Sequence, residues 1–449
     1  MSPTLRKILL LALAGFGAAC CCGLLVVLAA GGVAGYQLGF LVPAEPTLSP
    51  EQTTAKMAEI EAFVQATRGL TPTTPVALEF LTPDEVRQKT IADFEEDTTP
   101  QEMADGALSL AAFGLMDADV DLYSLLVDLY SDGIAGFYDP DSQQMVVVSG
   151  GSFNAYERTV YAHEYTHALQ DQTFGIRASG FSDEMYLADP ERFNAVQALL
   201  EGDASVLEGQ YLNTYGPLER GYYNKIVNDV SSIPAVYYQL PRFLLQDFVF
   251  PYREGKAFVQ HYYDQGGWAR VDQLWNDPPV SSEQIMHLER FEAGDDPLLV
   301  ARPPLTDTLG SGWRQIDTGV NGEWFTYLIL AYGEYSDYHL EEDVARAAAE
   351  GWGGDGYSVF YNAAGDETVL AAEWQWDTPA DAAEFAAAFR EYGDKRFGVV
   401  GRAAGGGSCW LTTTSNCLYT TATGTLWLAA EQQATLDALL ALFPAYGPP

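Results

Sequence analysis

The residues in this chain whose types and spacing are best suited to chemistry are His163-Glu164-Tyr165-Thr166-His167. They match H-E-x-x-H, a pattern in which two histidines stand four positions apart. On an α-helix these histidines lie on one face about one turn apart, so both imidazoles can bind the same metal ion. Glu164 follows the first histidine directly and is placed to take a proton from water activated by zinc. The chain contains only 5 histidines, which makes a chance match rare.

A helix must position these residues, and residues 157–171 contain no Gly or Pro that would interrupt one. The alternative is an amphipathic helix whose two histidines are only partly buried and hydrogen-bonded. Zinc in a catalytic site also needs a further protein ligand and one open coordination position. Residues 194–208 predict a second helix, in which Glu201 has apolar neighbours. Because a metal ion would compensate such a buried carboxylate, we expect Glu201 to be the third ligand.

Other residues of the second predicted helix leave alternatives open. Glu201 can instead be a solvated helix residue, with Glu208 and Asp203 as reserve ligands. Asp203 can also orient a ligand from outside the coordination sphere, as can Asp171 in the first helix. Gly202 has no side chain, so we expect another helix to approach closely there.

With these residues in view, the chain resembles the gluzincin zinc metallopeptidases, the group that includes thermolysin. It is most similar to little-characterised membrane-anchored bacterial members of that group. Their sequence motif H-E-x-x-H-A-L-Q-D-Q, followed by E-G-D-A, is present here at residues 163–172 and 201–204. The resemblance covers about residues 136–296 and extends more faintly to residue 376.

The resemblance implies one catalytic Zn²⁺, bound by His163, His167 and Glu201, with Glu164 as general base and acid. The interval between the second histidine and Glu201 is longer than in thermolysin-type enzymes. This difference predicts an inserted loop at residues 175–190.

Peptide hydrolysis produces an oxyanion, which needs a positioned donor in addition to zinc. Related enzymes use His or Tyr, and we expect His287, in the segment 282–288, to serve here as a catalytic residue. The alternative is a histidine that only caps or packs a helix turn. The competing donors are Tyr222, Tyr223, Tyr262 and Tyr263.

Residues 132–149 precede the metal-binding helix and predict a strand, a turn and a second strand rich in Val. An edge strand at this place can bind an extended peptide by adding it to the sheet. The alternative is an ordinary hairpin that supports the helix.

The N-terminus indicates where the protein resides. Residues 1–7 carry Arg6 and Lys7 and are predicted to be cytoplasmic, and residues 8–35 are apolar and long enough for a transmembrane signal anchor. Residues 36–55 then form a Pro-rich linker, and the body lies outside the cytoplasm. The rival interpretation is a lipoprotein signal ending at Cys20.

Charge and cysteine content narrow the partners and the compartment. The chain has 62 acidic against 23 basic residues and a net charge of −39, which repels phosphate backbones and argues against nucleic-acid binding. Cys409 and Cys417 flank a short polar segment, and an exported body permits a disulfide between them. Two free buried thiols are the alternative.

The predicted fold class is α+β. Residues 56–300 are expected to form a mainly helical, zincin-like metallopeptidase domain with a small edge sheet, and residues 313–449 a smaller α+β C-terminal domain. The predicted function is that of a membrane-anchored, single-pass, extracytoplasmic zinc metallopeptidase acting on a peptide or protein substrate. The alternatives are a zinc-bearing, non-catalytic binding or adhesion module and a zinc amidase acting on a component of the cell envelope.

Overall fold

The computed structural model describes residues 42–132, 136–148, 153–229 and 235–447. The predicted signal anchor at residues 8–35 lies outside these ranges. Among the described residues, no helix combines the length and apolar character that crossing a bilayer requires.

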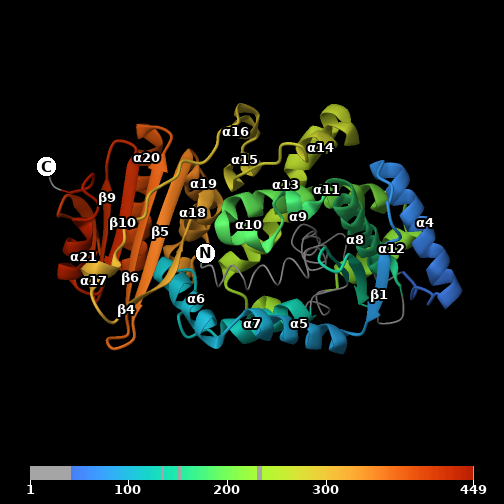
Figure 1. Ribbon diagram of the computed structural model, residues 1–449, viewed down its shortest axis with the longest axis horizontal. Coiled ribbons are helices and arrows are strands. Elements are labelled where there is room, and N and C mark those ends of the chain that lie inside the picture. The colour runs from blue at the N-terminus through green and yellow to red at the C-terminus, as the bar shows by residue number, and fades with distance from the viewer. Residues whose placement is uncertain (1–41, 133–135, 149–152, 230–234, 448–449) are drawn as a thin grey trace.

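The structure is α+β, with two sheets and helices between and around them (Figure 1). Its first half contains α4 (Pro50–Arg68), β1 (Ala77–Leu81), α5 (Pro83–Asp97), α6 (Pro100–Phe113), α7 (Leu122–Asp132), β2 (Gly136–Asp139), β3 (Gln144–Val148), α8 (Ala155–Phe174), α9 (Ile176–Ser179), α10 (Asp183–Ala188), α11 (Pro190–Leu212) and α12 (Pro217–Val227). Next come η2 (Ala235–Tyr238), α13 (Arg242–Gly266), α14 (Trp268–Leu274), α15 (Ser282–Met286), α16 (Leu288–Ala293) and α17 (Thr306–Leu309). The remainder contains β4 (Trp313–Gly319), α18 (Gly322–Ala331), η3 (Ser336–Tyr338), α19 (Glu342–Ala349), β5 (Trp352–Asn362), β6 (Glu367–Trp376), α20 (Pro379–Phe397), β7 (Arg402–Ala404), β8 (Gly407–Leu411), β9 (Ser415–Thr420), β10 (Gly424–Ala430) and α21 (Gln433–Leu440).

The helix predicted around H-E-x-x-H is α8, and its two ends are set by residues that favour helix termini. At the start, the side chain of Asn154 accepts hydrogen bonds from the backbone N–H groups of Tyr156 and Glu157, and Glu157 reciprocates. At the end, Gly175 adopts a left-handed conformation with φ of 69°. The predicted helix is therefore confirmed, and α8 is buried along nearly its whole length.

The second predicted helix is α11, which lies between α8 and α13. It begins at Pro190 after the cap residue Asp189, as expected for a proline in the first turn. At Gly202 the backbone of α13 comes so close that a Cβ there would lie 2.2 Å from the carbonyl oxygen of Gly255. The expectation that another helix approaches at Gly202 is confirmed. The predicted inserted loop at residues 175–190 contains two short helices, α9 and α10.

We expect Gly202→Ala to lower the free energy of unfolding by about 2 kcal/mol or more, because the added methyl group forces α11 and α13 apart. Gly209→Ala in the same helix is the matched control, since its Cβ would meet nothing closer than the Lys256 Nζ at 3.7 Å. That control should be neutral or slightly stabilising, because Ala favours helix more than Gly does. Chemical denaturation of both variants measures the difference, and equal stabilities would contradict the tight crossing.

The small sheet has the strand order β1-β3-β2, with β1 parallel and β2 antiparallel to β3. The predicted hairpin before α8 is confirmed as β2 and β3. Strand β2 is an edge strand, and it packs against α8. Among the described strands, β2 pairs only with β3, and its other side faces α8.

The seven-stranded sheet is antiparallel and has the order β4-β5-β6-β10-β9-β8-β7. Helix α20 covers one face, and α21 lies against a separate apolar cluster. Helix α6, from the first half of the chain, also packs on this sheet, where Phe113 contacts the rings of Tyr357 and Trp427. The disulfide predicted between Cys409 and Cys417 is confirmed, and it joins β8 to β9.

The segment that leads into this sheet lies flat against it. Leu298 donates its N–H to the Gly353 carbonyl at 2.6 Å, and a Cβ at Gly354 would lie 2.3 Å from the Leu298 carbonyl oxygen. The missing side chain at Gly354 therefore lets the connecting chain pass over β5 in direct contact.

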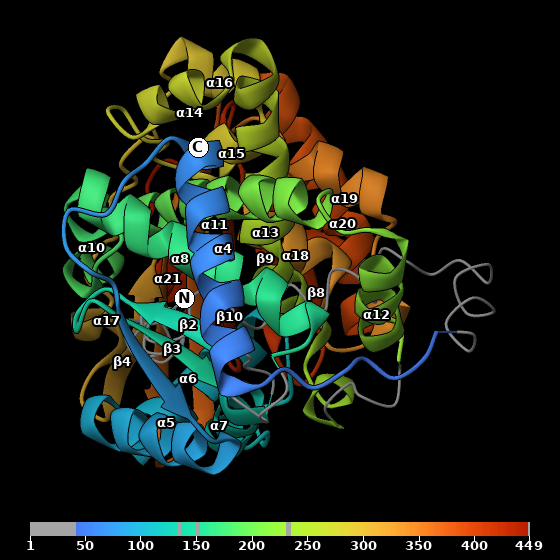
Figure 2. The same cartoon turned by 90° about the vertical axis from the view of Figure 1, so that its right-hand side faces the viewer.

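The N-terminal strap, which we define as residues 42–49, has no regular secondary structure but lies on the body. Helix α4 begins at Pro50, inside the predicted linker, and packs along α8 (Figure 2). Its last residue, Arg68, is 1% exposed and binds both carboxylate oxygens of Asp203 in α11 at 2.8 and 2.9 Å. A buried bidentate pair of this kind fixes α4 to α11.

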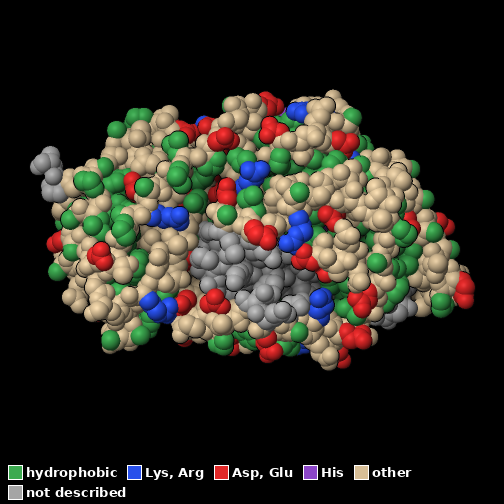
Figure 3. Space-filling model, viewed as in Figure 1, with side chains coloured by type: hydrophobic (Ala, Val, Ile, Leu, Met, Phe, Trp, Pro, Cys, Tyr) green, Lys and Arg blue, Asp and Glu red, His purple; other side chains and the backbone are tan. Residues whose placement is uncertain are grey.

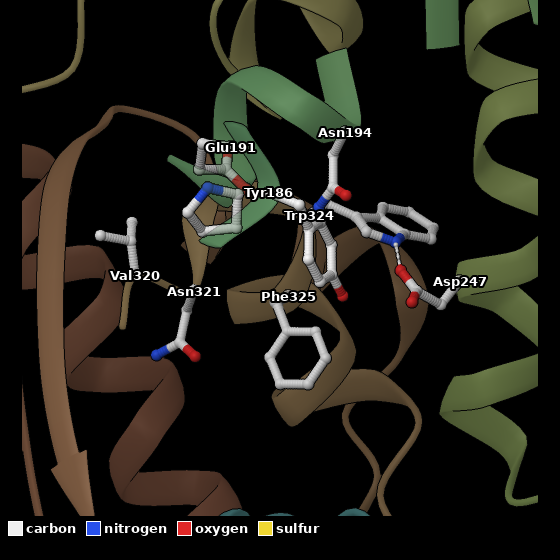
Figure 4. Close-up of a pocket in the computed structure, with 9 residues that line it drawn as sticks. Tyr186, Glu191, Asn194, Asp247, Val320, Asn321, Trp324 and Phe325 are labelled. Atoms are coloured by element: carbon white, nitrogen blue, oxygen red, sulfur yellow. Dashed lines mark hydrogen bonds between the residues drawn. The ribbon is translucent and has the colours of Figure 1, made fainter. Parts of the chain in front are cut away.

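A polar junction joins α11 and α15 to the start of α18. The buried Glu191 carboxylate accepts from the N–H and hydroxyl of Ser282 at 2.9 and 2.7 Å. Beside it, Asp355 accepts from the N–H groups of Asn321 and Gly322, both at 2.8 Å. Figure 4 shows the adjoining cavity of about 20 Å³, which is large enough for one water molecule. The junction is thus a packing interface and too small to admit a substrate.

Burial raises the pKa of Glu191 to about 8, with the charges of Asp355 and Asp189 adding to the shift. The folded protein therefore favours the protonated carboxyl. Its contribution to stability is present below the unfolded pKa of about 4.5 and is lost as the pH rises through about 8.

We expect Glu191→Gln to remove this loss, because an amide oxygen can still accept from Ser282 but cannot ionise. Between about pH 5 and pH 8 the variant should gain up to about 1.4 kcal/mol per pH unit relative to the parent. Denaturation curves at several pH values measure the gain. Parallel pH profiles for parent and variant would contradict the prediction.

Candidate metal centre

His163 and His167 of α8 and Glu201 of α11 come together as the sequence predicts. Their ligand atoms all lie within 4.8 Å of one another, and all three residues are buried. The Glu201 Oε2 atom lies 3.1 Å from the His163 Nε2 and 3.4 Å from the His167 Nε2. Among the described residues this is the one group of three or more His, Cys, Asp or Glu side chains that could hold a metal ion.

The two separations between Glu201 and the imidazoles are compatible with a metal ion such as zinc. With metal–ligand bonds of about 2.0–2.1 Å, such an ion separates neighbouring ligand atoms by about 3.3 Å. The observed separations of 3.1 and 3.4 Å agree with that value. In addition, the His167 Nε2 and Glu201 Oε1 atoms are buried and have no hydrogen-bond partner within the described part of the chain. Buried polar atoms are rarely left unpaired, so this pair of atoms suits a cation.

The other nitrogen of each imidazole is held from outside the ligand set. His163 Nδ1 lies 3.1 Å from the Glu208 Oε2, and His167 Nδ1 lies 2.7 Å from the Gln170 Oε1. The Gln170 amide in turn donates to the Leu200 carbonyl of α11 at 3.2 Å. Acceptors at both Nδ1 atoms favour the tautomers that present the Nε2 atoms to a metal.

Two other residues considered from the sequence have different partners. Asp203, a reserve ligand, binds Arg68 and also accepts from the Trp275 indole at 3.1 Å. Asp171 accepts from the Tyr138 hydroxyl at 2.8 Å. The orienting residue for His167 is Gln170, which the sequence analysis did not single out; its position three residues after the histidine, on the same helix face, was the available signal.

Glu164 lies beside the ligands, buried at 1% exposure. Its Oε2 atom accepts from the Tyr138 N–H of β2 at 3.0 Å. Its Oε1 atom has no hydrogen-bond partner among the residues described. The backbone of the edge strand therefore orients one oxygen of Glu164 and leaves the other available.

The electrostatics of the two carboxylates differ. Burial, together with the charges of Glu201 and Glu208, raises the pKa of Glu164 well above its ordinary value, although the charge of His163 opposes the shift. Burial alone would raise the pKa of Glu201 too, but the charge of His167 and the hydrogen bond and charge of His163 outweigh it and lower this pKa. Glu201 is thus favoured as an anion, as a metal ligand must be, and Glu164 as a proton carrier.

The structure places His287 between α15 and α16, where its Nε2 atom lies 2.7 Å from the Glu323 Oε1 of α18. Burial would lower the pKa of His287, but the hydrogen bond and charge of Glu323 outweigh it and raise this pKa. Its second neighbour is Glu289, at 4.0 Å. His287 is therefore part of the junction around α18, and its role as an oxyanion donor stays a prediction.

Comparisons with known proteins add little to this geometry. A domain of unknown function (DUF8575) matches residues 309–440, which include the seven-stranded sheet and exclude the metal centre. No curated protein matches the chain. Among solved structures, the chain is similar to a candidate hydrolase with a novel fold from Chloroflexus aurantiacus, at 17% identity and a TM-score of 0.37, over 58% of this chain and 95% of that chain. A likeness at this TM-score carries no argument about the site.

We expect Zn²⁺ to raise the melting temperature of the protein, because a ligand that binds only the folded state stabilises it. At a free zinc concentration 100 times the dissociation constant, the gain is about 2.7 kcal/mol. His167→Ala should abolish the gain, whereas His261→Ala, which removes a surface histidine bonded to Gln265, should retain it. Thermal unfolding with and without zinc measures the effect, and an equal gain in both variants would place the metal elsewhere.

Proposed function

We propose that this chain is a zinc-dependent metallopeptidase whose metal centre is His163, His167 and Glu201, with Glu164 as the general base. The observation that carries the proposal is the convergence of three buried ligand atoms beside a carboxylate oxygen that has no partner among the described residues. Structural ion pairs do not need such a fourth group, whereas hydrolysis does.

When bound, zinc supplies a Lewis acid that activates water and polarises the scissile carbonyl. Glu164 accepts the proton of the attacking water at its Oε1 atom and passes it to the leaving amine. The Tyr138 N–H holds the Oε2 atom at 3.0 Å, so the carboxylate keeps one orientation during both transfers. The raised pKa of Glu164 makes its carboxylate a stronger base towards water than an exposed carboxylate would be.

The edge strand β2 offers a place for the substrate. Its inner side pairs with β3, and the N–H of Tyr138 on its other side already reaches Glu164. A Cβ at Gly136 would lie 3.8 Å from the Glu164 Cγ, so this strand runs directly beside the base. An extended peptide that lies along this edge, with the Tyr138 N–H still bonded to Glu164, would have its backbone next to the metal centre.

The donor for the oxyanion is proposed to be His287, as the sequence suggests. Its imidazole would have to exchange Glu323 for the substrate, since these two side chains are now 2.7 Å apart. The four tyrosines named above remain the alternatives.

We further propose that the N-terminal segment anchors the protein and that the body is extracytoplasmic. The disulfide between Cys409 and Cys417 supports this location, because such bonds persist in oxidising compartments. The charge of the surface supports a protein or peptide partner over a nucleic acid. On the face shown in Figure 3, Lys and Arg side chains lie scattered among acidic ones and form no basic patch.

We expect Glu164→Gln to keep zinc and to lose about 10²–10⁴-fold or more in turnover, because an amide cannot accept the proton. Cleavage of an unfolded protein by the zinc-loaded full chain is the assay, with zinc content measured on the same samples. Glu59→Gln, an exposed residue of α4, is the control and should be as active as the parent.

Full turnover in Glu164→Gln would contradict the proposed mechanism. If parent and variant both bind one zinc and neither cleaves protein, peptidase activity is excluded for this substrate class. The amidase and the non-catalytic binding module would then be preferred, and cleavage of cell-envelope amides separates these two.

A further inference from the structure

Besides the N–H of the cap residue Asn154, which donates to Glu157 at 2.8 Å, the first turn of α8 contains three backbone N–H groups that need acceptors from outside the helix ladder. The side chain of Asn154 accepts two of them, from Tyr156 and Glu157, both at 3.0 Å. The third, that of Ala155, donates to the Glu45 Oε2 at 2.9 Å. The N-terminal strap therefore supplies the one acceptor that the cap residue of α8 does not.

The other oxygen of Glu45 has a partner in the same turn. Its Oε1 atom lies 2.8 Å from the Arg158 Nη1, and the two side chains are 16% and 5% exposed. Arg158 also donates to the Phe153 carbonyl at 3.1 Å and lies over the ring of Tyr215. A carboxylate at a helix N-terminus is favoured by the helix dipole as well, and burial strengthens both effects.

The rest of the strap is also in contact with the body. A Cβ at Gly221 of α12 would lie 3.0 Å from a methyl group of Val42. Leu48 packs against the apolar cluster that includes Tyr161 and Leu169 of α8. Ser49 then caps α4, which lies along α8. Within the Pro-rich linker that the sequence predicts at residues 36–55, these contacts hold Glu45 in place.

Helix α8 carries two of the proposed metal ligands and the proposed base, so the geometry of the metal centre depends on the position of this helix. Ala155 precedes His163 by eight residues, which is about 12 Å along a helix. The far end of the helix is held by the Gln170–Leu200 contact with α11. At the near end, Glu45 binds the N–H of Ala155, and the Tyr215 hydroxyl donates to the carbonyl of the same residue at 2.7 Å. Glu45 is thus one of the polar contacts that hold this end of the helix.

We infer that Glu45 is a positioning residue for the metal centre. Through Glu45, the N-terminal strap helps to set the position of the ligands on α8. This inference rests on the metal centre of the proposed function but not on its substrate. Loss of the Glu45 contact should let the first turn of α8 shift and weaken zinc binding. A break in the chain between residues 45 and 50 should have the same effect, so processing there would reduce metal affinity.

The test is the zinc affinity of the full-length protein, measured by competition with a chromophoric chelator. Glu45→Gln keeps an acceptor for Ala155 but loses the charge that faces Arg158, and Glu45→Ala loses both. We expect affinity to fall by roughly threefold in the first and tenfold in the second. The absorption spectrum of the Co²⁺-loaded protein should change in the same order. Glu59→Gln on the exposed face of α4 should change neither.

A second variant removes the donor in place of the acceptor. Ala155→Pro deletes the N–H that Glu45 binds, at the first helical position, which suits the proline backbone. Because Ala155 is fully buried, the melting temperature of the metal-free variant shows whether the larger ring is accommodated. It should weaken zinc binding about as much as Glu45→Gln does.

The melting temperature of the metal-free protein separates positioning from simple stabilisation. If Glu45→Ala lowers that temperature while zinc affinity and the cobalt spectrum stay those of the parent, Glu45 only stabilises the fold and the inference is overturned. Unchanged affinity in both Glu45→Gln and Ala155→Pro overturns it as well. Because none of these readouts needs peptide cleavage, failure of the peptidase proposal would be seen separately.

Discussion

The structure depends on one costly arrangement: the burial of a carboxylate, Glu201, against two imidazoles in the interior. Burying charged groups is unfavourable unless each is compensated, and here the compensation comes from the two imidazoles and from the metal ion that the group could hold. Several of the contacts that hold α8 and α11 around this group are polar and buried, among them Arg68 with Asp203 and Gln170 with the Leu200 carbonyl. A purely apolar contact between these helices would tolerate sliding, and a ligand set would not.

Three contacts supply that precision from different parts of the chain. The bare backbones at Gly202 and Gly255 allow α13 to press directly on α11. Arg68, the buried last residue of α4, fixes α11 through Asp203. The edge strand reaches Glu164 by its backbone, which is why no side chain of β2 needs to be catalytic. The site is thus assembled from helices, whose spacing is rigid, with a strand contributing orientation.

The sequence predicts those features that depend on local patterns. The two ligand helices, the hairpin before α8 and the close approach at Gly202 all follow from spacing, turn residues or the absence of a side chain. Glu201 could be expected because the two histidines require a third ligand. The partners of these groups could not be predicted, since Arg68 and Asp203, or Glu45 and Ala155, are over a hundred residues apart. The same holds for His287, whose partner Glu323 belongs to another element.

The packing of α6 on the seven-stranded sheet has a consequence for how the chain is divided. The family match begins at residue 309, yet the ring of Phe113 lies 5.1 Å from that of Tyr357 and 6.0 Å from that of Trp427. The segment matched by the family is therefore smaller than the structural unit, because the hydrophobic core of the sheet also needs Phe113 of α6. A protein carrying this sheet in another context needs a helix of its own in the place of α6, or it leaves aromatic surface exposed to solvent. The boundary of the family match, at residue 309, therefore differs from the boundary of the packed unit, which includes α6.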